Sequence, residues 1–353
     1  MNARIDLAQA SSIFGLDGES PHEQVLLHTD AVSGLRAILA VHSTVRGPAF
    51  GGCRMWSYAN DQAALTDALR LSQGMSLKNA LADLPFGGGK AVILHPPGTF
   101  DRAALFRAFG QAIAAFGGRY ITAEDVGSTT SDMRVVQQQT PFVSGIPRAG
   151  AFGGDPSPKT AYGVFVAIEE GVRHHLKKSL NGRTVAVQGL GAVGMSLCAY
   201  LHDAGVQLVV ADVNANRSIE AAHRFGARAV DPERILFESA DVLAPCALGA
   251  TINVDTVPRI QAAIVAGAAN NQLATPQDGD ELHARGILYL PDFLINAGGI
   301  VSVAREYLGT GTEESVSNEV GQIRDRVAHL LERSAGQAPA RAAGDWALEK
   351  LRA

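Results

Sequence analysis

Two lysines and a run of three glycines lie close together in residues 74–90, GMSLKNALADLPFGGGK. Lys78 and Lys90 are twelve residues apart. Glycines such as those at 87–89 can take backbone angles that other residues avoid, so they predict a sharp turn and let a ligand approach the backbone closely. A lysine after such a turn can bind an anion or transfer a proton. The segment lacks the spacing of a P-loop, and the alternative is a plain turn followed by a solvated lysine.

A carboxylate pair follows the predicted strand RYITA, residues 119–123. Glu124 and Asp125 come directly after this strand. A carboxylate in such a place commonly lies at the edge of a sheet where α/β proteins bind ligands. The alternative is a capping role, because residues 128–138 are compatible with a helix.

The segment TVAVQGLGAVG, residues 184–194, combines a β-rich run with glycines in G-x-G-x-x-G spacing, and a helix-compatible segment follows. In this motif the first glycine makes the turn, the second admits a pyrophosphate, and the third packs the helix on the strand. The phosphates then face the helix N-terminus. The candidate cofactor-binding residues of this loop are Gly189, Gly191, Ala192, Val193 and Gly194.

The next predicted strand, QLVVAD, ends in Asp212, eighteen residues after Gly194. An acid at this place is the expected partner of the ribose hydroxyls of NAD, and its charge should repel the extra phosphate of NADP. The nearby Arg217 keeps NADP from being excluded. The pattern therefore predicts NAD binding, with a Rossmann-like fold and an empty site as the alternative.

Three asparagines come just past the ends of later predicted strands: Asn270, Asn271 and Asn296. Their amides can bind the nicotinamide carboxamide or the substrate, although loop asparagines are also common turn formers. Thr160 lies at the start of the helix that leads into the dinucleotide motif, and it is a further cofactor-binding candidate.

The elements that must position these residues alternate between strands and helices. Residues 24–30 and 35–44 are predicted strands, and Gly51 and Gly52 give a second place for close backbone approach. Asp61 is the predicted N-cap of a helix that leads to Lys78. The buried side of that helix is predicted to contain Ala64, Leu65, Ala68, Leu69 and Leu71. Later predicted elements are a strand over 91–95, a helix over about 101–116, a hinge over 145–158 and an amphipathic helical tail from about 314.

Composition narrows the class of protein. A chain of 353 residues suits two domains, and its 46% hydrophobic content is typical of a globular protein. A net charge of −5 disfavours nucleic-acid binding and membrane-surface binding. The three widely spaced cysteines fit reduced thiols in a cytoplasmic protein, and they predict neither a disulfide framework nor a metal site. We expect no secretory signal and no membrane span.

Taken together, the motifs resemble the glutamate, leucine, phenylalanine and valine dehydrogenase superfamily, and the leucine and valine branch in particular. The collinear resemblance covers about residues 40–305 and rests on GGCRMW, GMSLK, LPFGGGKAVI, ITAEDVG, VQGLGAVG, APCALG, VAGAANNQL and NAGGIVSVA. It implies the reversible, NAD(P)-linked oxidative deamination of an L-amino acid to its 2-oxo acid and ammonium. It also implies a homo-oligomer, since similar enzymes form dimers up to octamers.

The resemblance implies a role for each charged candidate. Lys78 matches the partner of the substrate α-carboxylate, Lys90 the catalytic lysine, and Asp125 the proton-transferring aspartate. Hydride loss from Cα gives an iminium that water must attack. A lysine in a closed site can serve as general base to that water, while Asp125 moves protons to and from the amine.

Side-chain preference is predicted by the same comparison. Glutamate-specific members have a lysine at the position of Phe50 and a serine at the position of Val303. The apolar residues here disfavour an acidic substrate, because burying an unpaired carboxylate costs several kcal/mol. The predicted substrate-binding residues other than Lys78 are Phe50, Gly51, Gly52, Ala123, Ser144, Asn271, Ile300 and Val303. A branched-chain aliphatic substrate is favoured, and an aromatic one stays open because Phe50 is unusual in the leucine branch.

The expected fold is α/β with two domains: a substrate domain over 1–145 joined by helices from 316–353, and a Rossmann-type domain over 146–315. The catalytic site is expected in the cleft between them. A catalytically silent dinucleotide-binding sensor is the alternative from a different functional class.

Overall fold

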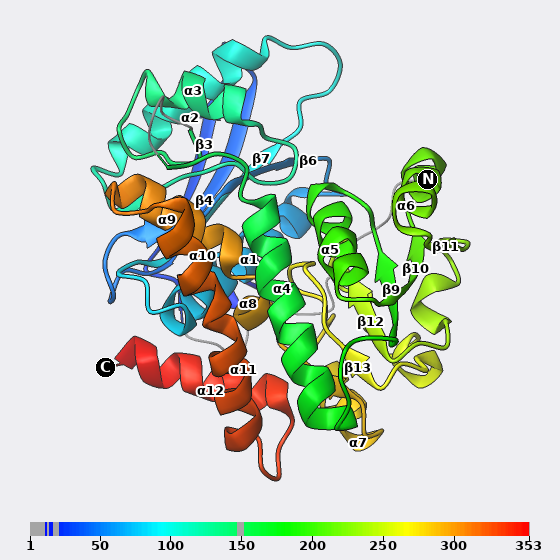
Figure 1. Ribbon diagram of the computed structural model, residues 1–353. Helices are drawn as coiled ribbons and strands as arrows, with labels where there is room; N and C mark the ends of the chain where they lie inside the picture. The colour runs from blue at the N-terminus through cyan, green and yellow to red at the C-terminus, as the bar shows by residue number, and fades with distance from the viewer. Residues whose placement is uncertain (1–10, 13, 17–20, 147–151, 353) are drawn as a thin grey trace. The chain divides into compact units, whose positions relative to one another are not determined.

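The structure is a computed structural model that describes residues 11–12, 14–16, 21–146 and 152–352. The chain forms two compact α/β units, which confirms the predicted two-domain fold class (Figure 1). The first unit contains the described residues up to 155, residues 302–313 and those from 347 on; the second contains 156–301 and 314–346. The boundary near 155 falls within the predicted hinge, of which residues 147–151 lie outside the described part.

The first unit is built on a mixed sheet with strand order β3-β4-β7-β5-β8. Its strands are β3 (Gln24–Asp30), β4 (Leu35–Ser43), β5 (Ala49–Phe50), β6 (Cys53–Trp56), β7 (Gly87–Leu94) and β8 (Tyr120–Ile121). β5 and β6 both run parallel to β7, and Gly51 and Gly52 separate them. A two-stranded sheet, β1 (Ser11–Ser12) and β2 (Gly15–Leu16), precedes these strands.

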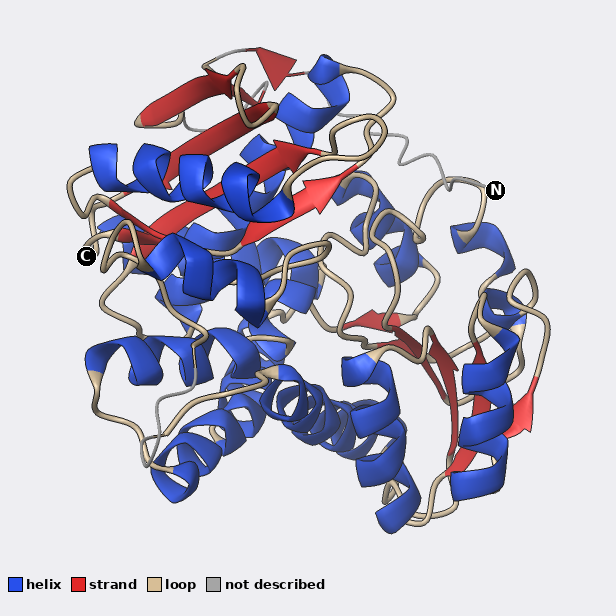
Figure 2. Ribbon diagram, turned by 90° about the horizontal axis from the view of Figure 1, so that it is seen from above, coloured by secondary structure: helices blue, strands red, loops and turns tan. Residues whose placement is uncertain are grey.

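Helices cover both faces of this sheet (Figure 2). One face packs against α1 (Asp61–Leu81) through apolar residues of β4 and β7. The other face packs against α2 (Arg102–Ala115) and α3 (Thr130–Gln137) through a larger apolar core. Strand alternation divides β7 between these faces: Val92 belongs to the α1 side, whereas Ala91 and Ile93 belong to the α2 side.

The glycine run 87–89 is part of β7, and the predicted sharp turn is wrong. None of these three residues has a positive φ. Close packing requires glycine here instead: a Cβ on Gly88 would lie 2.2 Å from the backbone N of Ser76 in α1, and one on Gly89 would lie 2.7 Å from the ring of Tyr120. A Cβ on Gly87 would lie 1.9 Å from the carbonyl oxygen of Ser43. Lys90 therefore lies within a buried strand that neighbouring backbones approach at contact distance.

The start of α1 differs from the prediction by one residue. Asn60 is the N-cap, and its side chain accepts a hydrogen bond from Ala63 N, whereas Asp61 is the first helical residue. An acid in the first turn still interacts favourably with the helix dipole. All five residues predicted for the buried side of this helix are buried.

The buried His42 joins β4 to α1, and the half-buried His22 joins the segment before β3 to the same helix. His42 Nδ1 is 2.7 Å from Ser76 Oγ, and His22 Nε2 is 2.9 Å from Ser72 Oγ. The two rings are 4.9 Å apart. Burial and the neighbouring His22 lower the pKa of His42 to about 4, although Glu23 opposes the shift.

This depressed pKa predicts a loss of stability in acid. Between pH 6.5 and pH 4 the unfolded chain binds a proton at His42 that the folded chain does not, so stability falls as pH decreases through this window. The expected loss is up to about 3 kcal/mol, since one pKa unit corresponds to about 1.4 kcal/mol. Urea unfolding at several pH values measures it. His42→Asn should flatten this dependence, and an unchanged slope in the variant would contradict the assignment.

The second unit contains a parallel sheet with strand order β11-β10-β9-β12-β13-β14. In chain order this is 3-2-1-4-5-6, the arrangement of the dinucleotide-binding Rossmann fold. The strands are β9 (Thr184–Gln188), β10 (Gln207–Ala211), β11 (Arg228–Ala229), β12 (Val242–Pro245), β13 (Ile264–Val265) and β14 (Leu288–Tyr289). The strand order reverses between β9 and β12, where such folds bind their ligands.

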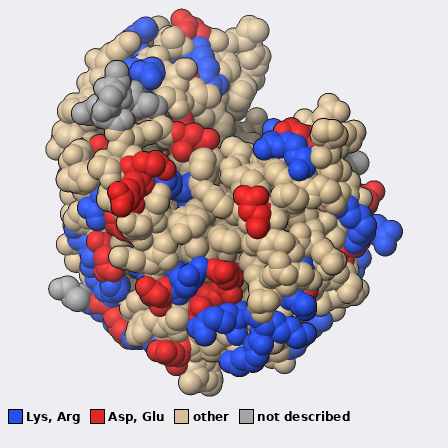
Figure 3. Space-filling view, in the orientation of Figure 1, with Lys and Arg blue, Asp and Glu red and all other residues tan. Residues whose placement is uncertain are grey.

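Helices complete the chain, and several pack against the second sheet. They are α4 (Ser157–Gly171), η1 (Val172–Leu176), α5 (Ala192–Asp203), α6 (Ala215–Phe225), η2 (Ile235–Phe237), η3 (Val257–Arg259), α7 (Pro276–Ala284), α8 (Asp292–Ile295), α9 (Gly298–Leu308), α10 (Glu313–Gly321), α11 (Ile323–Arg333) and α12 (Pro339–Arg352). No helix among the described residues is long and apolar enough to cross a membrane. On the face shown in Figure 3, Lys and Arg side chains lie among Asp and Glu side chains.

The helical tail divides differently from the prediction. Val320, Ile323 and Val327 are buried, as the amphipathic pattern predicted. However, α11 packs against α4, so residues 314–346 lie in the second unit and only those from 347 on lie in the first.

Candidate active site

Lys90 and Asp125 form a buried ion pair in the first unit. Lys90 Nζ lies 2.8 Å from Asp125 Oδ2, and the two side chains are 5% and 16% exposed. Burial alone would raise the pKa of Asp125, but the charges of Lys90 and Arg54 outweigh it and hold that pKa well below its usual range. The structure thus brings two of the predicted catalytic residues into direct contact, with the carboxyl group ionised.

The sheet explains this contact. Lys90 lies in β7, next to the break between β5 and β6 that Gly51 and Gly52 form. A Cβ on Gly51 would lie 1.9 Å from the carbonyl oxygen of Gly89, so the break requires glycine. Beyond β8, Cys53 N donates to Ala123 O, and this bond aligns the segment that carries Asp125 beside β6.

Asp125 is not a helix cap. The N-cap of α3 is Thr129, which forms a capping box with Asp132. The Asp125 backbone N donates instead to Ser128 Oγ, and Ser128 Oγ donates to Cys53 O. These bonds fix the main chain at Asp125 and leave its carboxyl group to the cations around it.

Arg54 is a site residue that the sequence reasoning missed. Its Nε lies 3.1 Å from Asp125 Oδ2, and its Nη1 lies 3.0 Å from Asp67 Oδ2. Tyr58 donates a 2.5 Å hydrogen bond to the same oxygen of Asp67. Two features of the sequence could have indicated this site. Arg54 lies within a short strand, and Asp67 lies between residues of α1 that were predicted to be buried.

Lys78 lies in the last turn of α1 and is buried, with 9% of its surface exposed. The backbone of the same helix approaches Gly88 of β7. Lys78 and Lys90 are therefore carried by two elements whose backbones touch. The structure places both lysines in the first unit.

The predicted substrate residues of the first unit are buried. Phe50 is fully buried, with its ring centroid 4.8 Å from that of Phe86 and 5.9 Å from that of Tyr307. Ser144 Oγ donates to the carbonyl oxygen of Val303 at 2.8 Å. Besides Lys78, the predicted substrate residues in the first unit are Phe50, Gly51, Gly52, Ala123, Ser144 and Val303.

The glycine loop after β9 has the geometry that a dinucleotide requires. Gly189 has φ +91°, and a Cβ on Gly194 would lie 2.0 Å from Gly189 O. A Cβ on Gly191 would meet nothing within 4 Å, so this position faces open space. Gly191 is the N-cap of α5, and no described side chain caps this helix, which leaves its first N–H groups for a phosphate. Ala192 and Val193 lie in that first turn.

Asp212 lies beside the glycine loop. Its Oδ2 accepts a 2.7 Å hydrogen bond from Leu190 N, and its Oδ1 accepts one from Asn214 N. Arg217 Nη1 is 3.6 Å from the same carboxyl group. Asp212, the predicted binding partner of the ribose, thus also stabilises the glycine loop that would hold the pyrophosphate.

Two further candidates of the second unit, Asn270 and Asn296, are hydrogen-bonded to each other. Asn296 Nδ2 donates to Ala268 O and to Asn270 Oδ1, both at 3.0 Å. Asn296 Oδ1 is buried and has no hydrogen-bond partner among the described residues. A carboxamide N–H₂ group is a suitable donor to this oxygen. The residues present therefore fit a nicotinamide dinucleotide.

Three further candidates also lie in the second unit. Asn271 adopts a positive φ of 52°, and its N–H donates to Asp292, so it serves as a turn former. Thr160 Oγ1 donates to Pro156 O, and a Cβ on Gly299 would lie 2.5 Å from that hydroxyl. Ile300 is 9% exposed and belongs to α9.

Cys53 lies directly before Arg54 in β6 and is fully buried. Burial raises the pKa of its thiol, so the thiol stays protonated and unreactive. All three cysteines are free thiols. No cluster of His, Cys, Asp and Glu that could hold a metal occurs in the part of the chain that the structure describes.

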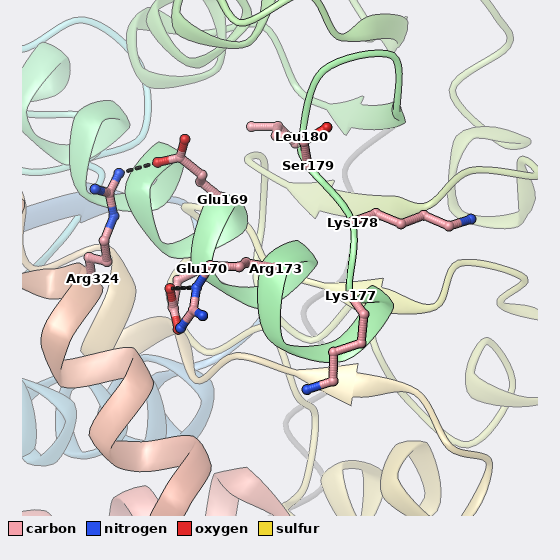
Figure 4. A pocket seen from close by; sticks show the side chains of 8 residues that line it. All are labelled: Glu169, Glu170, Arg173, Lys177, Lys178, Ser179, Leu180 and Arg324. Carbon is pink, nitrogen blue, oxygen red and sulfur yellow. Dashed lines mark hydrogen bonds and ion pairs between the residues drawn. The ribbon is translucent and has the colours of Figure 1, made fainter.

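A surface hollow in the second unit contains none of the predicted site residues (Figure 4). Two ion pairs line it, Arg173 with Glu170 and Arg324 with Glu169. Lys177 and Lys178 also line it, and Leu180 is the one apolar residue of its lining. The hollow therefore contains neither the Lys90–Asp125 pair nor the glycine loop after β9.

Comparisons with known proteins agree with this geometry. Residues 22–142 match the family model "Glu/Leu/Phe/Val dehydrogenase, dimerisation domain". Residues 155–216 and 206–337 match that of "Glutamate/Leucine/Phenylalanine/Valine dehydrogenase".

The relatives include enzymes for aliphatic and aromatic amino acids. The leucine dehydrogenase of Bacillus subtilis (strain 168) is 47% identical over 312 residues, which is 88% of this chain and 85% of the relative. The phenylalanine dehydrogenase of Bacillus thermotolerans is 42% identical over 315 residues, covering 87% and 82%. The crystal structure of L-tryptophan dehydrogenase from Nostoc punctiforme superposes with a TM-score of 0.77 at 41% identity, covering 94% and 96%. The resemblance predicted from the motifs is therefore confirmed: the chain belongs to the glutamate/leucine/phenylalanine/valine dehydrogenase family and is an amino acid dehydrogenase.

Proposed function

We propose that this enzyme catalyses the NAD-dependent, reversible oxidative deamination of a branched-chain aliphatic L-amino acid to its 2-oxo acid and ammonium. The observation that carries the proposal is the buried contact of 2.8 Å between Lys90 Nζ and Asp125 Oδ2. In this contact, the amine of Lys90 can take a proton from water, and the carboxyl group of Asp125 can exchange protons with the substrate amine. The first unit then holds the amino acid, and the second holds the dinucleotide.

Each charged residue has one task in this reaction. Lys78 binds the substrate α-carboxylate and stays charged in doing so, because its partner is an anion. Bound NAD supplies the hydride acceptor for Cα. Lys90 takes a proton from the water that attacks the resulting iminium, and Asp125 carries protons to and from the amino group. The short contact between Lys90 and Asp125 lets one proton pass between them without rearrangement of the main chain.

Substrate preference is proposed from the apolar side chains. Phe50 is packed by Phe86 and Tyr307, and Val303 is 6% exposed, so neither position offers a charge to an acidic substrate. Burying an unpaired carboxylate there would cost several kcal/mol. Initial rates of NADH formation over a panel of L-amino acids test this. We expect the highest kcat/KM for leucine, valine or isoleucine; a maximum for phenylalanine or tryptophan would favour the aromatic alternative, and a maximum for glutamate would refute both.

Preference for NAD is proposed to depend on Asp212. In the Asp212→Ser variant, the ratio of kcat/KM with NADP to that with NAD should rise about tenfold or more, because like charges in contact cost several kcal/mol. Arg217, now 3.6 Å from the carboxyl group, would then be available to the 2′-phosphate. The ratio cancels losses that arise because the variant also loses hydrogen bonds to Leu190 and Asn214. The exposed Asp203 at the end of α5 supplies the control, Asp203→Ser, whose ratio should stay at the wild-type value.

We also propose that the enzyme is a homo-oligomer, since the family model that matches residues 22–142 is described as a dimerisation domain. Light scattering of the purified protein should give at least twice the 36.9 kDa of one chain. A mass of one chain at micromolar concentration would refute this.

A further inference from the structure

The Lys90–Asp125 pair is the end of a longer row of side chains with alternating charges, which are joined by ion pairs. Asp125 Oδ2 receives Lys90 at 2.8 Å and Arg54 Nε at 3.1 Å. Arg54 Nη1 continues to Asp67 Oδ2 at 3.0 Å, and Tyr58 ends the chain on that same oxygen. Two cations and two anions therefore alternate and sum to zero.

The sheet register places Arg54 in this chain. Arg54 pairs with Val92 of β7, two residues beyond Lys90, so both charged side chains leave the same face of the sheet. A parallel β-bridge pairs Cys53 with Glu124, so the residues that follow them, Arg54 and Asp125, lie side by side. The face is the one that α1 covers, and α1 supplies Asp67.

Burial makes these contacts strong. The side chain of Arg54 is 13% exposed and that of Asp67 is 5% exposed. Removing one partner of such a chain leaves a buried charge unpaired. Burial and Asp67 also raise the pKa of Tyr58, which therefore remains a neutral hydrogen-bond donor to Asp67.

We propose that Arg54 is a positioning residue for the reaction: it holds the Asp125 carboxylate in place beside Lys90 and keeps it ionised, and Asp67 fixes Arg54 in turn. The inference rests on the proposed function of Asp125 as the proton-transferring group. The protonation of the Asp125 carboxyl group, which Arg54 controls in this proposal, can be measured without turnover.

Lys90 and Arg54 both contact the same oxygen of Asp125. Arg54 stabilises the ionised form of that carboxyl group whether or not Lys90 is protonated. When Lys90 gives up its proton during the cycle, Arg54 still opposes protonation of Asp125 in the ground state. Asp125 then accepts a proton only transiently and returns it, which suits a shuttle better than a permanent acid.

The test uses the full-length enzyme and the variants Arg54→Gln, Arg54→Lys and Asp67→Asn. The matched control is Arg36→Gln, because the exposed pair of Arg36 and Asp61 also joins this sheet to α1. The first readout is the pH profile of kcat/KM for leucine. In Arg54→Gln, the acid limb should move up by about one pH unit or more, because the loss of a cation at contact distance makes protonation of the Lys90–Asp125 pair easier.

The other variants give distinct outcomes. Arg54→Lys keeps the charge but lacks the planar fork of N–H donors that reaches both carboxylates, so its acid limb should stay near the wild-type position while kcat falls about tenfold or more. Asp67→Asn removes a negative charge and should not move the acid limb upward. Arg36→Gln should match the wild type in both respects. A merely structural role would reduce the amount of folded enzyme without moving the acid limb of Arg54→Gln, and that result would overturn the proposal.

The second readout separates this proposal from the proposed function. Carbon-13 NMR of protein labelled at aspartate Cγ, with Asp125→Asn used for assignment, follows the Asp125 carboxyl group directly. Its titration should move to higher pH in Arg54→Gln whether or not leucine is a substrate. An unchanged Asp125 titration in that variant refutes the role of Arg54, whereas a shifted titration in an enzyme that deaminates no amino acid refutes only the proposed function.

Discussion

Replacing Lys90 by alanine is expected to reduce deamination by about a thousandfold or more while NADH still binds. General base catalysis by a positioned side chain contributes about 10²–10⁴-fold, and the variant also takes from Asp125 its closest cation. Initial rates measure the first effect, and quenching of protein fluorescence by NADH measures the second.

Two controls make the Lys90 result interpretable. Lys178→Ala removes an exposed lysine in the second unit and should leave turnover unchanged. Far-UV circular dichroism of the Lys90→Ala variant should match the wild type, because Arg54 still pairs with Asp125. Turnover within tenfold of the wild type, in a folded variant, would exclude Lys90 as the catalytic base.

Replacing Gly88 by alanine is expected to destabilise the protein by about 3 kcal/mol or more, at the upper end of overpacking effects. The new Cβ would lie 2.2 Å from Ser76 N and 2.6 Å from Ser72 O, both backbone atoms of α1. No change of rotamer relieves such a contact, so α1 must move away from β7. Urea unfolding measures the loss, and the displacement of Lys78 with α1 should raise KM for the amino acid.

Gly344→Ala is the matched control for Gly88. Gly344 lies in α12, and a Cβ there would meet nothing within 4 Å. Alanine is favoured over glycine in a helix by up to about 1 kcal/mol, so this variant should be as stable as the wild type or more stable. If the two glycine variants unfolded at the same urea concentration, close approach of α1 to β7 would not be the reason for glycine at position 88.

The Rossmann unit could be predicted because its information is local. The glycine spacing, the strand before Gly189 and the acid at Asp212 all lie within about thirty residues of one another, as the motif requires. The structure places these residues in one loop and one strand end. The substrate unit carries less local information, since β7 begins with three glycines, which a sheet disfavours except where another backbone approaches closely. The atoms that crowd these glycines belong to Ser43, Ser76 and Tyr120, which the sequence alone does not place beside them.

Arg54 could not be assigned from the sequence for the same reason. Its two partners, Asp67 and Asp125, are 13 and 71 residues away and lie on different elements. The pattern of α1 correctly predicted which residues are buried, but it gave no partner for an aspartate among them. The amphipathic tail behaved similarly: its buried face was predictable, whereas its packing partner, α4, was not.

The contact between α1 and β7 has a consequence for how enzymes of this kind can diversify. Main-chain atoms of α1 and β7 meet at Gly88, so this contact sets how far apart the backbones that carry Lys78 and Lys90 lie. In the proposed function, Phe50 and Val303 contact the substrate side chain, so exchanges at these two positions leave the contact at Gly88 in place. Under the proposed roles, the fold separates the residues that bind the invariant part of an amino acid from those that contact its side chain, and new substrate preferences then require changes at only a few apolar positions.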